Sequence, residues 1–318
     1  MKRKGNIYQK IYSIDNLKLA DKFARKKKQN QSSVKDFDKN PEAKIIDLHY
    51  QLKEKRYKTS EYQTFIVREP KERLVFRLPY WPDRIAQWAA MIHVAPILQA
   101  SLTSHSYSCI KGKGIHPLSY DLRDALKDVE NTKYCLKLDI KKFYSNVDHG
   151  ILKSQLRRKF KDKDLLWFLD EIIDSSPGLP IGNYTSQHFS NFYLNGFDHW
   201  LKEKMGVKKC FRYTDDIVIL SGSKGYLHAL LADIREYFKT HLKLEIKDNY
   251  QVFLVSSRGI DIVGYRHFHT HVLIRKSIKK RCAKKLWKNR NIHTIGAYNG
   301  WLKHADTINL RRKLKIAA

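Results

Sequence analysis

The stretch FRYTDDIVIL, residues 211–220, places two adjacent carboxylates inside a run that otherwise predicts a buried β-strand. Its aromatic residues favour a strand, and the apolar run Val218–Leu220 requires a buried environment. Asp215 and Asp216 require water, a cation or a metal, because an unpaired buried carboxylate is very unfavourable. The stretch therefore predicts a β-hairpin that carries a charged functional site.

A third carboxylate occupies a similar position upstream. In LDIKKFYSNVD, residues 138–148, Asp139 ends the apolar strand that begins at Tyr134 and precedes a basic, aromatic turn. Three carboxylates from adjacent strand ends could hold two divalent cations about 3.5–4 Å apart, which activate a 3′-oxygen and stabilise a leaving pyrophosphate. Oxygen ligands favour Mg²⁺, with Mn²⁺ as a possible substitute.

The composition predicts a polyanionic partner. The chain has 318 residues and a formal net charge of +30, with 42% hydrophobic residues, which is enough to fold. Residues 274–318 carry a net charge of +13 and residues 1–35 a net charge of +9. Both ends are therefore candidate surfaces for the phosphates of a nucleic acid.

Cysteine usage and hydropathy indicate a reduced, soluble, cytoplasmic protein. The four cysteines, at 109, 135, 210 and 282, form no CxxC pair and suggest neither a zinc site nor a disulfide framework. The basic N-terminus has no apolar segment after it, and no run approaches the roughly 18 apolar residues of a membrane span. We expect no membrane partner.

Helical and strand periods alternate along the chain and predict an α+β fold. A polar linker is expected over 24–40, and helices are expected over 41–57, 83–100, 116–130, 148–174 and 226–241. Residues 178–204 should form a Gly/Pro turn followed by a long helix. Residues 62–79 should form a hairpin with its turn near 69–72, and further strands are expected over 134–140, 211–221, 243–246 and 259–276. A basic amphipathic helix should follow, with Ile278, Cys282, Ala283, Leu286 and Trp287 on its apolar side. We expect the helices to cover one face of an antiparallel sheet.

In their order and spacing, these motifs resemble those of the reverse transcriptases, from about residue 40 to the end of the chain. The resemblance implies a right-hand polymerase with an antiparallel palm sheet backed by helices. Its domains would be a basic extension over 1–38, fingers over 39–105 and 148–180, a palm over 106–147 and 181–272, and a thumb over 273–318. The activity would be RNA-directed DNA synthesis from deoxynucleoside triphosphates.

The resemblance also implies roles for individual residues. The catalytic and metal-binding residues would be Asp139, Asp215 and Asp216, with Ile140 included in the metal site. Lys71 and Arg73 would grip the triphosphate, Tyr144 would block a ribose 2′-OH, and Ile181, Gly182 and Gln187 would hold the incoming nucleotide. Primer or template contacts would come from Lys111, Lys113, Gly264, Tyr265, Arg275, Lys276, Lys280 and Lys284.

Two signals have simple alternatives. Lys247 is the nearest candidate for the lysine that protonates pyrophosphate, but it could equally be a solvated surface lysine. His267, His269 and His271 alternate, so all three would face one way in a strand, yet no fourth metal ligand is apparent.

One departure from most reverse transcriptases indicates a subgroup. Ile181 stands before Gly182 where most have Gln, and Gln187 follows Ser186 where most have Pro. IGNYTSQ is similar to the loop of diversity-generating retroelement reverse transcriptases, which copy a template-repeat RNA into cDNA with errors at adenines. That likeness implies a small basic oligomeric accessory variability protein as partner, and a short thumb without further domains fits the end at Ala318.

Other function classes stay open. The chain could be a reverse transcriptase of a group II intron, retron or phage-defence lineage, or an RNA-dependent RNA polymerase. Aromatic Tyr144 disfavours ribonucleotide use, and IGNYTSQ disfavours the ordinary intron and retron loop. A non-catalytic RNA-binding scaffold is disfavoured by the three retained aspartates, which would be unfavourable without a function.

Overall fold

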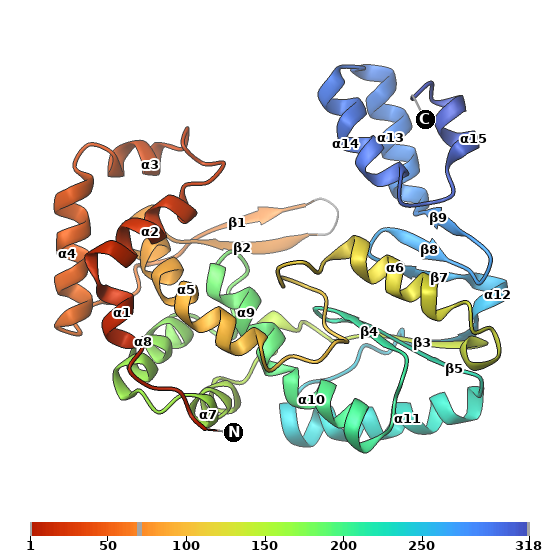
Figure 1. The fold of residues 1–318 in the computed structure, drawn as a ribbon, viewed down its shortest axis with the longest axis horizontal. Coiled ribbons are helices and arrows are strands. Elements are labelled where there is room, and N and C mark those ends of the chain that lie inside the picture. The colour runs from red at the N-terminus through yellow and green to blue at the C-terminus, as the bar shows by residue number, and fades with distance from the viewer. Residues whose placement is uncertain (1, 69–71, 317–318) are drawn as a thin grey trace. The chain divides into compact units, whose positions relative to one another are not determined.

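The structure, a computed structural model, describes residues 2–68 and 72–316 (Figure 1). The chain divides into two compact units. The first comprises Met1–Thr103, Lys141–Asp198 and Lys239–Leu244, and the second comprises Ser104–Ile140, His199–Phe238 and Glu245–Ala318. Within the described residues, no helix is both long and apolar enough to span a membrane.

The first unit is mainly helical and is built around one apolar helix. It contains α1 (Tyr8–Tyr12), α2 (Ile14–Ala24), α3 (Ser32–Phe37), α4 (Pro41–Lys53), β1 (Gln63–Val67), β2 (Arg73–Arg77), α5 (Ile85–Gln99), α7 (His149–Lys159), α8 (Lys163–Asp174) and α9 (Tyr184–Tyr193), and α10 (Asn195–His199) follows. Since α5 is apolar on most sides, it forms the centre of the unit and packs against α2 and α9. The region 24–40, expected to be a linker, includes the short helix α3, whose Val34 and Phe37 are buried.

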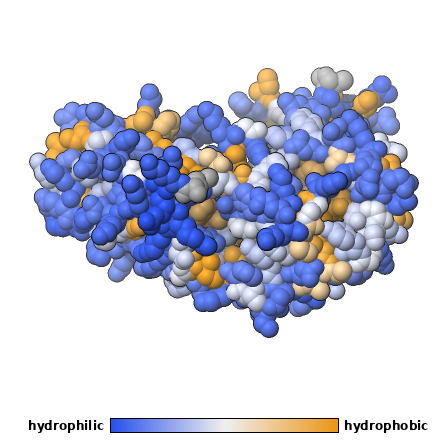
Figure 2. All heavy atoms as spheres, turned by 60° about the horizontal axis from the view of Figure 1, so that its bottom comes forward, coloured by the Kyte–Doolittle hydropathy of each residue, from blue (hydrophilic) through white to orange (hydrophobic). Residues whose placement is uncertain are grey.

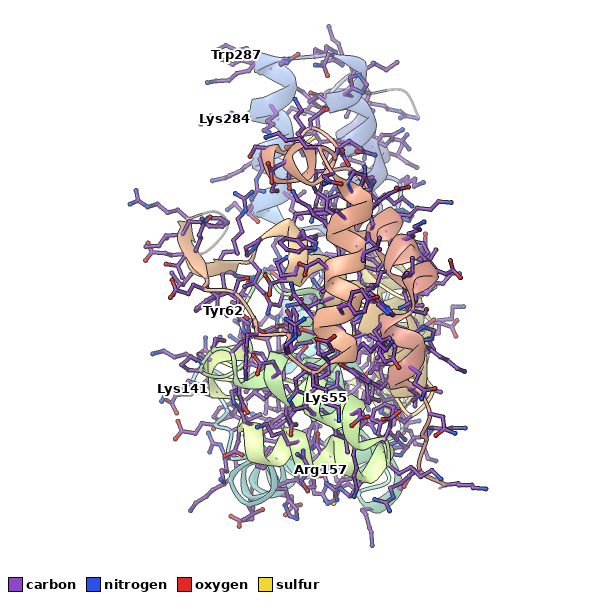
Figure 3. The ribbon with its side chains drawn as sticks, turned by 90° about the vertical axis from the view of Figure 1, so that its left-hand side faces the viewer. Lys55, Tyr62, Lys141, Arg157, Lys284 and Trp287 are labelled. Carbon is purple, nitrogen blue, oxygen red and sulfur yellow. The ribbon has the colours of Figure 1, made fainter. Side chains whose placement is uncertain are left out.

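Strands β1 and β2 form the predicted hairpin. They pair antiparallel from Gln63↔Arg77 to Val67↔Arg73, and most of their residues are exposed. The expected turn lies largely outside the described residues, and so does Lys71. Tyr62 lies just before β1 (Figure 3). Its hydroxyl bonds to Ser175 (2.7 Å) and accepts a hydrogen bond from the Asn183 amide (2.7 Å).

The second unit contains a four-stranded antiparallel sheet in the order β4-β5-β3-β6. Its strands are β3 (Tyr134–Asp139), β4 (Cys210–Tyr213), β5 (Asp216–Ser221) and β6 (Gln251–Leu254), and its helices α6 (Ile115–Ala125) and α11 (Lys224–Tyr237) lie on opposite sides of the sheet (Figure 1). The expectation of helices on one face alone was wrong. Both faces of β3 and β5 bury apolar side chains, Cys135 and Val218 toward α6 and the alternate residues toward α11.

A smaller sheet and a helical cluster end the chain. The sheet is β7 (Ile260–Ile262), β8 (Tyr265–His267) and β9 (Val272–Ile274), and the helices are α12 (Val255–Arg258), α13 (Lys276–Lys288), α14 (Ile292–Leu302) and α15 (Ile308–Lys313). The predicted basic helix is confirmed as α13, but its predicted apolar side was partly wrong. Cys282 and Leu286 are buried, whereas Ala283 is exposed and Trp287 is 85% exposed (Figure 3), because residues 283 and 287 lie about 100° around the helix from that pair.

Two further strand expectations were wrong. Residues 243–246 form no strand; Ile246 makes a single bridge to Ile140, and the pairing edge strand is β6, which the sequence analysis missed. The three histidines do not share one strand face. His267 alone lies in β8, where it is fully buried and bonded to the Ser119 hydroxyl (2.7 Å), while His269 and His271 lie between β8 and β9.

Candidate functional site

The turn between β4 and β5 is tight and strained. Tyr213 pairs with Asp216, so Thr214 and Asp215 form a two-residue loop. Thr214 has φ of +58°, which is rare for a β-branched residue because its side chain crowds the backbone there. Strain of this kind persists only where the surroundings enforce it.

Buried polar contacts enforce this turn. The Thr214 hydroxyl donates to Ser108 Oγ (2.8 Å), and the guanidinium of Arg212 donates to the Thr214 carbonyl (3.0 Å). Arg212 is fully buried and also donates to the Ser106 hydroxyl. These contacts fix the backbone from which the side chains of Asp215 and Asp216 project.

Asp139 lies directly opposite Asp216. The antiparallel register of β3 and β5 pairs the two residues, so their side chains emerge on the same face of the sheet. Burial raises the pKa of Asp216 to about 6; the charges of Asp139 and Asp215 add to this rise and Lys137 opposes it. The site therefore concentrates negative charge in a partly buried position.

Two lysines balance this charge. Lys247 Nζ lies 2.6 Å from Asp139 Oδ1, and its backbone N–H donates to the Asp139 carbonyl (2.9 Å). Lys137 Nζ lies 3.5 Å from Asp216 Oδ1 and donates a hydrogen bond to the Asp261 carbonyl. The ion pair places Lys247 at the carboxylate site rather than at a separate surface.

The carboxylates keep capacity for a further ligand. Asp139 Oδ1 and Asp216 Oδ1 are buried, and neither accepts a hydrogen bond from the described residues beyond its lysine contact. Carboxylate oxygens of this kind fit a hard divalent cation such as Mg²⁺. Across 2–68 and 72–316, however, no three His, Cys, Asp or Glu side chains are grouped as metal ligands. The three-carboxylate metal set, with Ile140 beside it, stays a prediction.

In the first unit, Gly182 allows the loop at residues 181 and 182 to pack closely against β2. Gly182 has φ of +130°, and a Cβ there would lie 2.0 Å from the Phe76 carbonyl oxygen. The Phe76 N–H donates to the Ile181 carbonyl (2.8 Å). Ile181 is half-buried and Gln187 is exposed, and Arg73 lies exposed at the start of β2.

Tyr144 is held by the same part of the chain. Its carbonyl accepts from the Leu179 N–H (2.7 Å), and its hydroxyl accepts from Ser190 Oγ (3.3 Å). Gly178 permits this approach, since a Cβ there would lie 2.6 Å from the Tyr144 carbonyl oxygen. The loop and helix α9 thus position the predicted sugar-blocking residue.

Several predicted primer or template residues have structural contacts. Tyr265 is fully buried and donates to the Trp301 carbonyl (3.1 Å), and a Cβ on Gly264 would lie 2.6 Å from the Trp301 ring. The Lys113 ammonium donates to the carbonyls of Ser104 (3.0 Å) and Ser106 (2.9 Å).

The other predicted contacts are more accessible. Arg275 pairs with Asp261 (2.5 Å), and the remaining members of the set are exposed: Lys111, Lys276, Lys280 and Lys284. Sequence reasoning missed Lys137 and Arg212. The first lies two residues before Asp139 and so on the same strand face, and the second is a charge inside an apolar strand, which are signals that could have identified both.

Comparison with known proteins gives consistent matches. Residues 69–267 match the family described as "Reverse transcriptase (RNA-dependent DNA polymerase)". A putative COX1/OXI3 intron 2 protein of Saccharomyces cerevisiae is 22% identical over 203 residues, which cover 42% of this chain and 24% of that protein. The chain thus spans about a quarter of that curated relative.

Solved structures of telomerases share the fold. Telomerase from Candida albicans, in complex with a TWJ fragment of telomeric RNA, matches with a TM-score of 0.51 and 12% identity over 73% of this chain and 51% of that one. Apo telomerase from Candida tropicalis matches with a TM-score of 0.51 and 11% identity over 70% and 49%. These likenesses confirm the predicted α+β right-hand polymerase fold with its antiparallel sheet.

Replacing Asp216 by Asn should stabilise the metal-free protein at neutral pH. The pKa of Asp216 is about 6 in the folded protein, above the ordinary value of 3.8. At a pH above about 6 the Asp216 carboxylate is ionised, and this ionised form opposes folding. Since the side chain is 29% exposed and screened by solvent, we expect a gain of about 1–2 kcal/mol at pH 7.

Thermal unfolding with a chelator, measured from pH 4 to pH 8, checks this prediction. The Tm advantage of Asp216→Asn should be about 2–4 °C or more at pH 7 and should shrink as the pH falls from 6 toward 4. Asp233→Asn, at an exposed site on α11, is the matched control. A pH-independent gain, or a loss at pH 7, would contradict the account.

Proposed function

The chain belongs to the reverse transcriptase (RNA-dependent DNA polymerase) family, and from this we propose that it extends a DNA primer along an RNA template. The observation that carries the proposal is the pairing of Asp139 with Asp216 across adjacent strands, beside the strained turn that holds Asp215. A scaffold without catalysis would have no use for this concentration of charge.

Each polar group of the site has a role in this proposal. Asp139, Asp215 and Asp216 would hold two Mg²⁺ ions, with Ile140 beside them and Mn²⁺ as a possible substitute. Bound magnesium would lower the pKa of the primer 3′-hydroxyl and stabilise the leaving pyrophosphate. The Lys247 ammonium, 2.6 Å from Asp139, would orient that carboxylate and is a candidate proton donor to pyrophosphate.

The remaining contacts would select and hold the substrates. Arg73 and Lys71 would bind the triphosphate, and Ile181, Gly182 and Gln187 would line the site of the incoming nucleotide. Tyr144, anchored through its carbonyl and hydroxyl, would exclude a 2′-OH by volume. The exposed lysines of α13 would follow the phosphates of the template–product duplex, with Trp287 outside the core.

We further propose the diversity-generating retroelement lineage, in which a template-repeat RNA is copied with errors at adenines. The support is the combination of Ile181 and Gln187 in the nucleotide-holding segment. A small basic oligomeric accessory variability protein would then be a partner. The likeness to a yeast intron protein keeps the group II intron lineage as the second candidate, beside the retron and phage-defence lineages.

Asp215→Asn should abolish polymerisation while it preserves folding. The change removes one charge and keeps the side-chain shape, so we expect primer extension to fall by about 10³-fold or more through loss of charge stabilisation. Primer extension on an RNA template with Mg²⁺ measures this, with Asp233→Asn as control and RNA affinity as the test of integrity. Extension by Asp215→Asn at a near wild-type rate would overturn the assignment.

Ile181→Gln should lower misincorporation opposite template adenine more than it lowers synthesis. Gln could restore one hydrogen bond to a correctly paired nucleotide, which is worth about 0.5–1.5 kcal/mol, or a few-fold to roughly tenfold in discrimination. Deep sequencing of cDNA, normalised for yield, measures the effect, and Ile181→Leu is the apolar control.

Two results would count against this role of Ile181. The first is an adenine error rate that does not change in Ile181→Gln. The second is an error rate that falls equally in Ile181→Leu, since Leu adds no hydrogen bond.

A further inference from the structure

A chain of polar contacts leads from the carboxylate pair to the start of helix α13. Its members are Asp216, Lys137, Asp261 and Arg275, all of which lie in the second unit. Each contact joins residues of different elements, from β5 to β3, then to β7, and then to the residue before α13. The chain therefore connects the four-stranded sheet with the helical cluster that follows the smaller sheet.

Lys137 lies on the same strand face as the carboxylate pair. It is two residues before Asp139 on β3, so the two side chains leave the strand on one face. The register places Val218 of β5 opposite Lys137, and Asp216 is two residues before Val218. Only 24% of the Lys137 side chain is exposed, so protein atoms must provide most of the acceptors for its ammonium.

The Lys137 ammonium is shared between two partners. Its Nζ lies 3.5 Å from Asp216 Oδ1, and it donates a hydrogen bond to the Asp261 carbonyl. Since β7 is an edge strand of the smaller sheet, it presents backbone acceptors that need partners outside that sheet. Lys137 meets this need at Asp261, and the same ammonium thus holds the edge of the smaller sheet beside the carboxylate site.

The side chain of Asp261 continues the chain of contacts toward α13. Its Oδ1 accepts a hydrogen bond from Arg275 Nε (2.7 Å), and a guanidinium nitrogen of Arg266 lies 4.0 Å from its Oδ2. Arg275 is the residue before α13, and its N–H donates to the Gly264 carbonyl (2.9 Å). Asp261 therefore contacts Lys137 through its backbone and Arg275 through its carboxylate.

Lys137 and a divalent cation would compete for Asp216. An ammonium 3.5 Å from Asp216 Oδ1 occupies space and neutralises charge that a metal ion at this oxygen would need. A like charge within about 4–6 Å opposes the binding of a cation, and the partly buried position strengthens the repulsion. Because Asp261 offers a second acceptor, the ammonium can leave Asp216 without losing all of its partners.

We propose that Lys137 is a positioning residue that couples the carboxylate site to the start of α13. In the free protein its ammonium lies beside Asp216 in place of a metal ion, and it withdraws toward Asp261 when a divalent cation binds. Arg275 controls this withdrawal, because it holds the Asp261 carboxylate. The contacts do not depend on the function of the protein, whereas the part that Lys137 plays in catalysis rests on the proposed polymerase activity.

Binding of Mn²⁺ to the full chain tests the competition, with the free ion measured by electron paramagnetic resonance at pH 8. Lys137→Met removes the ammonium and keeps an unbranched side chain, and Lys137→Arg keeps the charge. Lys133→Met is the matched control, since Lys133 lies just before β3 and its ammonium pairs with Glu130 (2.8 Å).

We expect Lys137→Met to bind Mn²⁺ about 3- to 10-fold more tightly than the wild type, because the competing charge is gone. Lys137→Arg and Lys133→Met should bind it as the wild type does. Primer extension by Lys137→Met at saturating Mn²⁺ should nevertheless be about tenfold slower, because Asp216 has lost a group that orients it. Tighter metal binding together with a slower reaction is not expected of a residue that only stabilises the fold.

The coupling to α13 is tested by Arg275→Gln, alone and combined with Lys137→Met. Without Arg275, the Asp261 carboxylate is free to attract Lys137 away from Asp216, so Mn²⁺ should bind about 2- to 3-fold more tightly. In the Lys137→Met protein, Arg275→Gln should not change the affinity for Mn²⁺. Lys279→Gln, at an exposed residue of α13, controls for the loss of one positive charge.

Four results would count against these assignments. Equal Mn²⁺ affinity in the wild type and Lys137→Met, including no saturable binding by either, would overturn the competition. Arg275→Gln acting equally with and without Lys137, or acting like Lys279→Gln, would overturn the coupling. Extension by Lys137→Met at the wild-type rate would overturn its positioning role. Absent extension by the wild type, with Lys137-dependent Mn²⁺ binding intact, would reject the polymerase function and leave the coupling standing.

Discussion

Repulsion between carboxylates that face each other across β3 and β5 governs the structure around the site. The register puts Asp139 directly opposite Asp216, and burial in this position raises the pKa of Asp216. Two lysines counter the negative charge of this pair. Lys137 lies on β3, the strand that ends at Asp139, and Lys247 follows Ile246, which forms a bridge to Ile140. The strained Thr214 turn is similarly held by a buried arginine. The site thus lowers the stability of the folded protein locally, and it retains negative charge that a metal-dependent reaction can use.

Charge of the opposite sign gathers around a cavity in the first unit. Lys28, Arg77 and Arg84 line a cavity with buried donors that have no acceptor among the described residues. Hydrophilic residues cover most of the face in Figure 2, as expected for a chain with a net charge of +30. The cavity differs from such a general basic surface because its cations converge on one hollow and two of them, Lys28 and Arg84, are half-buried.

The sequence predicted those features that depend on short-range patterns. The strand around FRYTDDIVIL, the hairpin at 62–79 and the basic helix α13 all follow from alternation or helical spacing. Trp287 was wrongly assigned to the buried side of α13, because the assignment relied on the size of the aromatic ring and not on the position of the residue around the helix. Residues 243–246 were assigned a strand, because four alternating residues cannot show whether a partner strand lies beside them. The cavity around Lys28 could not be predicted, since its walls come from segments more than 150 residues apart in the chain.

The central claim, that the aspartate pair is completed by a divalent cation, is tested most directly by thermal unfolding with and without Mg²⁺ at constant ionic strength. A cation that binds only the folded state, at about tenfold above its dissociation constant, should stabilise the wild type by about 1.4 kcal/mol. A double variant, Asp139→Asn with Asp216→Asn, should show no stabilisation by Mg²⁺. An equal Mg²⁺-dependent rise in Tm for both proteins, or no rise for the wild type at any Mg²⁺ concentration, would contradict the claim.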